Sequence, residues 1–266
     1  MKDLLNTPWR KISTAVYGPP NEGKIYGTAD IDVTSAVSFI KNHRNAGRYL
    51  TITHLAAAAL GRALGVDIPE VNVYLRRGKL IQRNDVIVTV AVNMGDGGEM
   101  GSVRIRGAHK KTVFEIAEEI IGKAKTSRGG TENRAMKKKH SLSKIPWPFR
   151  RGVFRLLKWI TNELGFELKP LGLTHEAFGS VLLSNIGSHG LTTGFAALFP
   201  ASRLPAVITM GEIEDRPVVR DGEIVIRKMV TFGGVFDHRI MDGFHGGKLA
   251  SSAKKYLENP ELLAKT

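Results

Sequence analysis

The sequence predicts a mixed α/β sandwich, in which helices pack against a sheet of parallel and antiparallel strands. Stretches with an apolar residue at every second position are interspersed with stretches whose apolar residues recur with the helical period. Their order lacks the regular strand–helix–strand alternation of a purely parallel sheet. The chain has 266 residues, 42% of them hydrophobic and 24% charged. It therefore has the composition of a globular protein and can bury a substantial core.

The first half of the chain predicts a strand, two helices, a hairpin and a central strand. The first strand and helix are expected in KIYGTADIDVTSAVSFIKNHRNAG. The helix is expected from about Thr34 to Asn45, with Thr34 as its N-cap, and Gly47 is expected to end it. A second helix is expected in LTITHLAAAALGRALG, and its wide apolar face indicates burial. A hairpin around Arg77-Gly78 then leads into a central strand from Val86 to Val92.

The second half predicts a helix, two strands, a hairpin and a closing helix. The helical period of apolar residues marks KKTVFEIAEEIIGKAK. Alternating patterns mark strands in GSVLLSNIG and AVITMGEIED. A hairpin turned at Asp221-Gly222 follows, because an Asp-Gly pair favours the tight turn between two strands. The last helix is expected in GFHGGKLASSAKKYLENPELL.

The positive charge is concentrated in one part of the chain. The net charge is +14, and between Ile121 and Ile160 the sequence has twelve Lys or Arg residues against one acid, Glu132. This segment overlaps an insertion at about 128–172 that interrupts the alternation of strands and helices. From Gly152 onward the apolar residues share a broad helical face, with Arg155 and Lys158 opposite.

The insertion has two interpretations. A basic amphipathic helix with nearby aromatic residues can bind a membrane surface or a partner. It can equally pack on the domain and leave its basic face in solvent. Nucleic-acid binding is disfavoured because the basic run lacks a recognised nucleic-acid-binding module.

Three absences limit the function classes. The chain contains no cysteine, which excludes disulfides, thiolate metal sites and cysteine nucleophiles. No apolar run reaches the roughly 18 residues of a membrane-spanning helix. The first residues lack the apolar stretch of a signal peptide. We therefore expect a cytoplasmic protein, with a peripheral place at a membrane as the alternative that the basic insertion allows.

The stretch FDHRIMDGFHGG contains the residues best suited to chemistry. His238 follows a strand, and an imidazole titrates near neutral pH and can take a proton from a thiol or an alcohol. Asp242 is placed to cap the last helix, and Gly243 permits close backbone approach. Two alternatives remain open at this point: a structural polar turn, and a metal site formed by His238, Asp242 and His245.

This stretch resembles the D-H-R-x-x-D-G motif of dihydrolipoamide acyltransferases, the core subunits of 2-oxo acid dehydrogenase complexes. DGFHGGKL is also similar to chloramphenicol acetyltransferase, and both groups share one fold superfamily. LLSNIG, ADIDVTSAVSFI, VIVTVAVNMGDGG, KKTVFEIAEEI and YLENPELL resemble further parts of the acyltransferase domain. The resemblance covers roughly residues 8–127 and 177–263. It implies a chloramphenicol acetyltransferase-like two-layer α/β sandwich with a mixed sheet, and a single catalytic domain over 1–266 with an insertion at about 128–172.

The resemblance also implies a mechanism. His238 would be the general base that deprotonates a thiol, and the hydroxyl of Ser184 would stabilise the tetrahedral oxyanion. Asp242 would hold the loop through an arginine, for which Arg10 is the candidate, and Arg239 would form an ion pair. Coenzyme A or acyl-coenzyme A would be the substrate, without a metal. The chain would be a homotrimer whose active sites lie between subunits.

The sequence departs from the family in three respects. It shows no lipoyl domain, so we expect a stand-alone form that carries no covalently bound lipoyl group. The family's early R-M-x-x-S and I-P-H signatures are missing, and the insertion at 128–172 replaces a short connection. We therefore expect a coenzyme A-dependent acyltransferase that moves an acyl group between coenzyme A and a thiol, amine or alcohol acceptor. Its insertion would bind an acyl carrier, a lipoyl domain, a long acyl chain or an acidic membrane surface. The alternative is a non-catalytic trimeric scaffold that binds a membrane or a partner.

Overall fold

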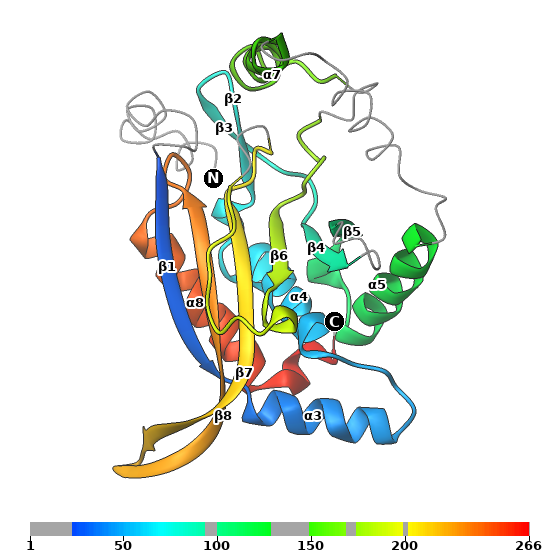
Figure 1. Cartoon of the computed structure of the whole chain (residues 1–266), viewed down its shortest axis with the longest axis vertical. Coiled ribbons are helices and arrows are strands. Elements are labelled where there is room, and N and C mark those ends of the chain that lie inside the picture. Colours follow the sequence, from blue (N-terminus) through cyan, green and yellow to red (C-terminus); the bar gives the residue numbers. More distant parts are fainter. Residues whose placement is uncertain (1–22, 94–99, 129–148, 169–173, 199–201, 266) are drawn as a thin grey trace.

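The computed structural model describes residues 23–93, 100–128, 149–168, 174–198 and 202–265. Its centre is a six-stranded sheet in the order β1-β8-β7-β6-β4-β5 (Figure 1). The strands are β1 (Lys24–Asp32), β4 (Ile87–Asn93), β5 (Met100–Arg106), β6 (Val181–Asn185), β7 (Ala206–Arg220) and β8 (Glu223–Asp237). β6 runs parallel to both β4 and β7, whereas the other neighbours are antiparallel. The predicted mixed α/β fold is confirmed.

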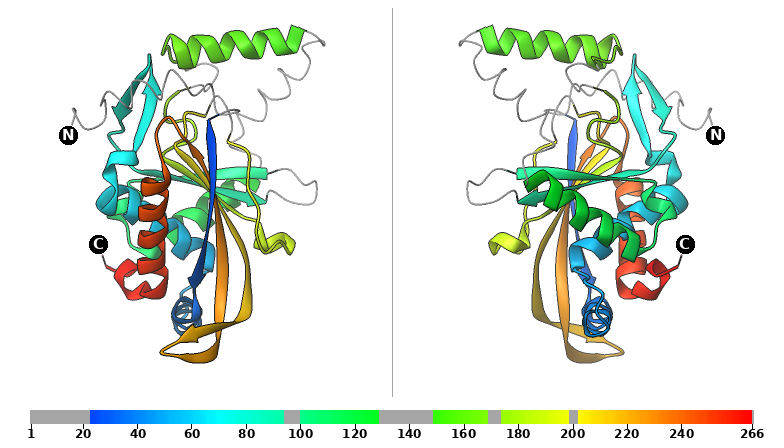
Figure 2. Two further views of the ribbon diagram at one scale, coloured as in Figure 1. Left: turned by 90° about the vertical axis from the view of Figure 1, so that its left-hand side faces the viewer. Right: turned by 90° about the vertical axis from the view of Figure 1, so that its right-hand side faces the viewer.

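One face of the sheet is covered by helices, as Figure 2 shows for α4 and α8. The longer helices in this layer are α3 (Thr34–Asn45), α4 (Ile52–Arg62), α5 (Val113–Arg128) and α8 (Gly243–Glu258). Their buried apolar residues and those of the strands form one large core cluster. The alanines and leucines of α4 are nearly inaccessible to solvent. This burial agrees with the wide apolar face of the helix in the sequence.

The opposite face carries only chain connections in the described part of the molecule. The segment between β6 and β7, which includes the short helix η6 (Gly187–His189), lies on this side (Figure 2). A small second cluster forms beneath it from Leu198, Leu204, Val207 and Val235. This connection covers Val207, Thr209 and Val235, which are buried, whereas Ser184 on the same face is half-buried.

Both predicted hairpin turns are present. β2 (Val73–Arg76) and β3 (Lys79–Gln82) pair around Arg77 and Gly78, whose φ angles are 50° and 69°. β7 and β8 are joined at Asp221 and Gly222, with φ angles of 51° and 85°. Two consecutive positive φ angles characterise the turn that matches the twist of antiparallel strands.

The start of α3 corrects one prediction. Thr34 is the first residue of the helix, and its backbone N–H donates to Oδ1 of Asp32 at 3.0 Å. The N-cap is therefore Val33 and not Thr34, and Val33 makes no side-chain capping bond. The predicted end is confirmed: Gly47 has φ of 80°, and its N–H donates to the carbonyl of Arg44.

The insertion contributes α7 (Phe149–Lys158) and the π-helix η4 (Trp159–Glu163). Figures 1 and 2 show α7 set apart from the sheet and its helices. Residues 129–148 and 169–173 of the insertion lie outside the described residues. The remaining short helices are η1 (Ala63–Asp67), η2 (Pro69–Val71), η3 (Ala108–Lys110) and η7 (Pro260–Leu263). No helix in the described ranges has the length and apolarity needed to cross a bilayer.

Candidate active site

His238 sits in a tight turn between β8 and α8. The turn closes on Asp237, whose carbonyl accepts from the N–H groups of Ile240 at 2.8 Å and Met241 at 2.9 Å. The N–H of Asp237 donates to the carbonyl of Pro205, just before β7. The turn is thus fixed to the sheet at the point where β8 ends.

Two hydrogen bonds orient His238 itself. Its backbone N–H donates to the carbonyl of Gly23 at 2.7 Å, next to the start of β1. Its ring Nδ1 lies 2.9 Å from the carbonyl oxygen of Met241. Because a carbonyl can only accept, Nδ1 carries the proton in this contact, and in the neutral ring Nε2 holds the lone pair. The turn therefore presents His238 in the tautomer of a general base.

Asp237 and Arg239 form a buried ion pair that stiffens the turn. Arg239 donates from Nε to Oδ1 of Asp237 at 2.9 Å and from Nη2 to Oδ2 at 2.6 Å. The two side chains are 2% and 10% exposed. Two parallel bonds between a guanidinium and a carboxylate fix both groups, so the backbone on either side of His238 is held. Sequence reasoning assigned an ion pair to Arg239 but missed its partner, although an acid two residues before an arginine was a usable signal.

Asp242 is the N-cap of α8. Its Oδ1 accepts from the backbone N–H of His245 at 3.2 Å and lies 2.6 Å from Nδ1 of the same residue. This is the capping role that its position before Gly243 predicts. Arg10, the expected ion-pair partner of Asp242, lies outside the described residues. The described residues contain no group of three or more side chains placed to hold a metal ion.

Ser184 lies on β6, on the face away from the helices. Its neighbours Leu183 and Asn185 point to the helix side: Leu183 is fully buried, and Nδ2 of Asn185 donates to Oγ1 of Thr53 on α4 at 3.0 Å. Since side chains alternate along a strand, Ser184 points to the other face together with Leu182, which packs on the smaller cluster. Ser184 is half-buried.

One copy of the chain does not bring His238 and Ser184 together. Ser184 pairs with Thr209, which pairs with Gly233 of β8. His238 is five positions beyond Gly233, about 16 Å along the strand, and Ser184 is two strands away, about 10 Å across the sheet. The structure therefore places the two predicted catalytic side chains too far apart for one reacting group.

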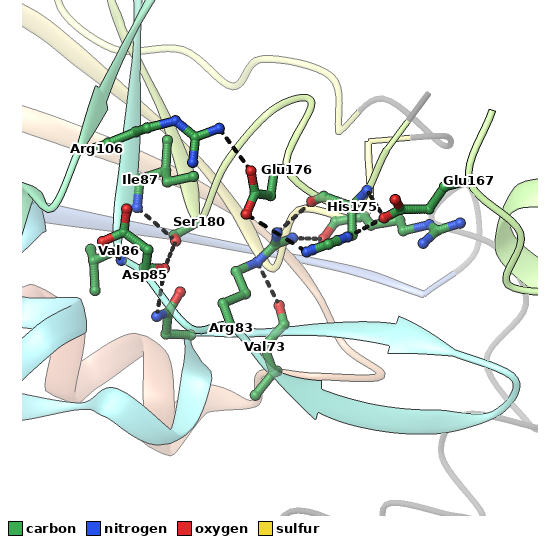
Figure 3. A network of polar contacts seen from close by, with 12 residues as sticks. Val73, Arg83, Asp85, Val86, Ile87, Arg106, Glu167, His175, Glu176 and Ser180 are labelled. Carbon is green, nitrogen blue, oxygen red and sulfur yellow. Dashed lines mark hydrogen bonds and ion pairs between the residues drawn. The ribbon is translucent and has the colours of Figure 1, made fainter. Parts of the chain in front are cut away.

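A buried arginine network joins the insertion to this end of the sheet. Figure 3 shows the guanidinium of Arg83 between Val73, His175 and Glu176. Arg83 donates to the carbonyls of Val73, His175 and Arg203, and burial lowers its pKa to about 10. Sequence reasoning did not single out Arg83, because a buried arginine looks like any surface arginine in a sequence.

The second arginine of this network, Arg203, holds the C-terminal end of η4. Its guanidinium donates to the carbonyls of Thr161 and Phe166. Two residues after Arg203, Pro205 accepts the N–H of Asp237. The insertion is thus tied to the segment that supports the turn of His238.

The chain was compared with known proteins. The model of the family described as 2-oxoacid dehydrogenases acyltransferase (catalytic domain) matches residues 22–139 and 171–265. A dihydrolipoyllysine-residue acetyltransferase component of the pyruvate dehydrogenase complex of Staphylococcus epidermidis is 35% identical over 118 residues. The match covers 43% of this chain and 26% of that protein. The chain therefore spans about a quarter of the length of the curated relatives it matches.

Solved structures show the same fold. A probable dihydrolipoamide acetyltransferase of Listeria monocytogenes superposes with a TM-score of 0.66 at 20% identity, covering 94% of this chain and 88% of that one. A chloramphenicol acetyltransferase superposes with a TM-score of 0.55 at 14% identity, covering 96% and 97%. The chloramphenicol acetyltransferase-like fold implied by the motifs is confirmed. Because the family model matches more than half of the sequence, the chain belongs to the family of 2-oxoacid dehydrogenase acyltransferase catalytic domains.

Proposed function

We propose that the chain is a coenzyme A-dependent acyltransferase that moves an acyl group between coenzyme A and a second thiol. The observation that carries the proposal is the bond from Nδ1 of His238 to the carbonyl of Met241. It directs the lone pair of Nε2 away from the turn, as a general base requires. Family membership supports the reaction class.

The proposed reaction begins with proton transfer from the acceptor thiol to Nε2 of His238. The ordinary pKa of a thiol is about 8.5. Most of the acceptor thiol is therefore protonated at neutral pH, and a base is needed to form the thiolate. The thiolate attacks the thioester carbonyl carbon, a new carbon–sulfur bond forms, and the carbonyl oxygen becomes an oxyanion. The hydroxyl of Ser184 donates to this oxyanion. When the intermediate collapses, the original carbon–sulfur bond breaks and the leaving thiolate takes the proton back from His238.

The separation of the two residues implies that the site is shared between copies. Ser184 is half-buried and lies on the face of the sheet opposite to α3, α4, α5 and α8, where a second copy can present its His238. We therefore propose a homotrimer in which His238 of one copy works with Ser184 of the partner subunit. Three copies in a ring give three equivalent sites of this kind.

The first test is acyl transfer by the purified chain. With acetyl-coenzyme A and dihydrolipoamide, we expect release of free coenzyme A and formation of acetyl-dihydrolipoamide, both measured by chromatography. His238→Ala should lower the rate by a factor of about 10² to 10⁴, the usual contribution of a general base. His43→Ala on α3 is the matched control and should keep the wild-type rate. Equal rates in wild type and His238→Ala would refute the mechanism.

A second candidate function, binding to an anionic membrane surface, is favoured by the exposure of α7. Phe149 and Leu156 of α7 are 69% and 55% exposed, and Trp159 at the start of η4 is 52% exposed, although α7 has a clear apolar face. The helix also belongs to the segment with twelve basic residues and one acid. Exposed apolar side chains on a basic helix suit the interface of an anionic bilayer.

Vesicle sedimentation tests this second function. We expect binding to vesicles of phosphatidylcholine mixed with phosphatidylserine, weakening as salt screens the charges, and little binding to phosphatidylcholine alone. Leu156→Glu should weaken binding by about tenfold or more, because a leucine contributes roughly 1.5–3 kcal/mol on burial. Leu262→Glu, at another exposed leucine, is the matched control. Equal binding by the two variants would exclude α7 as the binding element.

A further inference from the structure

An apolar cavity of about 200 Å³ lies beside the turn of His238, between β1, β8 and α8. Its walls include Ile25 and Ile31 of β1, Phe232 and Phe236 of β8, and Leu249 of α8. It lies on the helix side of the sheet, so it is separate from the face that carries Ser184. The only ionisable carboxylate in its lining is Asp242, and that side chain is engaged with His245.

The cavity is long and narrow. Its lining follows β1 from Ile25 to Ile31, about 20 Å of strand, and α8 from Asp242 to Ala253, about 16 Å of helix. A volume of about 200 Å³ spread along such a length suits an alkyl chain better than a ring. An apolar cavity of roughly 150 Å³ holds the six carbons of benzene, so this one has room for about eight carbons.

One end of the cavity adjoins the proposed base. Asp242 in the lining follows Met241, whose carbonyl binds Nδ1 of His238. On the other wall, Ile25 lies two residues after Gly23, whose carbonyl accepts the N–H of His238. The cavity extends from there into the core, to Leu60 of α4 and Ala253 of α8. A hydrocarbon chain in it would therefore end next to the turn that carries the base.

The cavity opens to solvent on one side, where Tyr26, Gly27, Thr28, Gly243 and Gly247 of its lining are exposed. The rest of its lining is mainly apolar. An alkyl chain that covers these walls removes apolar surface from water, which is favourable. The space exists partly because α8 carries glycine at position 246, whose Cβ would stand at ordinary contact distance, 3.7 Å, from the ring of Phe236.

We propose that this cavity binds the alkyl part of the acyl group, so that the chain prefers acyl thioesters of about eight carbons over acetyl thioesters. This proposal rests on the acyltransferase function proposed above. The carbonyl would lie at the turn of His238 and the alkyl chain between β1 and α8. The gain in kcat/KM with chain length follows from burial, at most about fourfold for each methylene.

The test compares acetyl-, butyryl-, hexanoyl- and octanoyl-coenzyme A with dihydrolipoamide as acceptor. The wild type should favour octanoyl over acetyl by about tenfold or more. Gly246→Leu should lower the ratio of octanoyl to acetyl kcat/KM by at least as much, because its side chain fills the cavity. Gly122→Leu on α5, where an added Cβ meets nothing within 4 Å, is the control helix glycine and should leave the ratio unchanged. Equal kcat/KM for acetyl and octanoyl thioesters in the wild type would overturn the proposal.

A binding measurement separates this proposal from the catalytic one. Titration calorimetry with free octanoate should show binding to the wild type and to Gly122→Leu, and loss of binding in Gly246→Leu. If the chain turns over no thioester, the proposed acyltransferase function is refuted. The octanoate measurement then decides by itself whether the cavity binds an alkyl chain. Octanoate affinity that is absent in the wild type, or unchanged in Gly246→Leu, refutes the cavity as an alkyl site.

Discussion

At the scale of single residues, the turn of His238 is held from both sides. Gly23 accepts its N–H and Met241 accepts its Nδ1 proton, while Asp237 and Arg239 lock the backbone between them. A base that must take a proton at a fixed place benefits from such constraint, because misplacement of a reacting group by about 1 Å costs up to about a hundredfold in rate.

A second histidine, His54 on α4, predicts how stability depends on pH. Burial and the nearby charge of Arg44 lower its pKa from 6.5 to about 4. The folded state therefore binds fewer protons than the unfolded state between those pH values, so stability falls as the pH drops from 6.5 towards 4. The loss from His54 alone is about 2 kcal/mol at pH 5.

Urea unfolding at pH 7 and pH 5 checks this expectation. His54→Gln removes the titrating group, so the variant should lose about 2 kcal/mol less than the wild type on acidification. Asp32, Glu119 and Glu176 have lowered pKa values, and His54→Gln leaves all three in place, so we expect their contributions to cancel in the comparison. The same loss in both proteins would show that His54 is protonated in the folded state.

Much of the site could be predicted at this scale, but its connections could not. The motif located His238, Asp242 and Ser184, and the position of Asp242 before a glycine-rich helix indicated a cap. The acid two residues before Arg239 indicates its ion-pair partner, but the sequence does not show that the pair is buried. The separation of Ser184 from His238 depends on strand order, because it is the pairing of β6, β7 and β8 that places them about 16 Å apart along the strands.

At the scale of elements, periodicity was a reliable guide where one face is buried. α3 and the hairpins around Arg77-Gly78 and Asp221-Gly222 lie where the pattern and the turn residues predict them. α7 shows the limit of the same signal, since its apolar face is as regular as that of a packed helix although Phe149 and Leu156 are exposed. A pattern of apolar residues predicts a face that will be covered and leaves open what covers it.

The arginine network is an element-scale feature that no local pattern could reveal. Arg83 at the end of β3 reaches the carbonyls of Val73, His175 and Arg203, which come from three separate parts of the chain. Each is a backbone acceptor, so no side chain signals the contact in advance. Removing Arg83 would leave several buried acceptors unsatisfied, which is costly.

At the scale of the whole molecule, the sheet has two unlike faces. Helices bury one of them and form most of the core, whereas the other carries Ser184 and a thin set of connections. The proposed trimer places the active site on this second face. A site shared between copies makes a prediction about mixtures of variants that a site within one chain does not make.

Mixing two inactive variants tests the shared site. His238→Ala and Ser184→Ala should each be nearly inactive alone. When they are co-expressed and form mixed trimers, about a quarter of the sites should combine an intact His238 with an intact Ser184 from the adjacent copy. Activity should therefore return to about a quarter of the wild-type rate. Mixed assemblies, verified by two different affinity tags, that stay inactive would contradict a site built from two copies.

The hydrogen bond between Asn185 and Thr53 distinguishes the native register of β6 from a shifted one. Ser184 and Asn185 are adjacent, and one points outward while the other is tied to α4. A slip of β6 by a single residue would exchange their faces, burying the serine and exposing the asparagine. Such a slipped strand would also turn Val181 and Leu183 out of the core cluster and would lose the hydrogen bond to Thr53. The amide of Asn185 thus marks the correct register, and only a chain folded in that register can offer its serine to a partner.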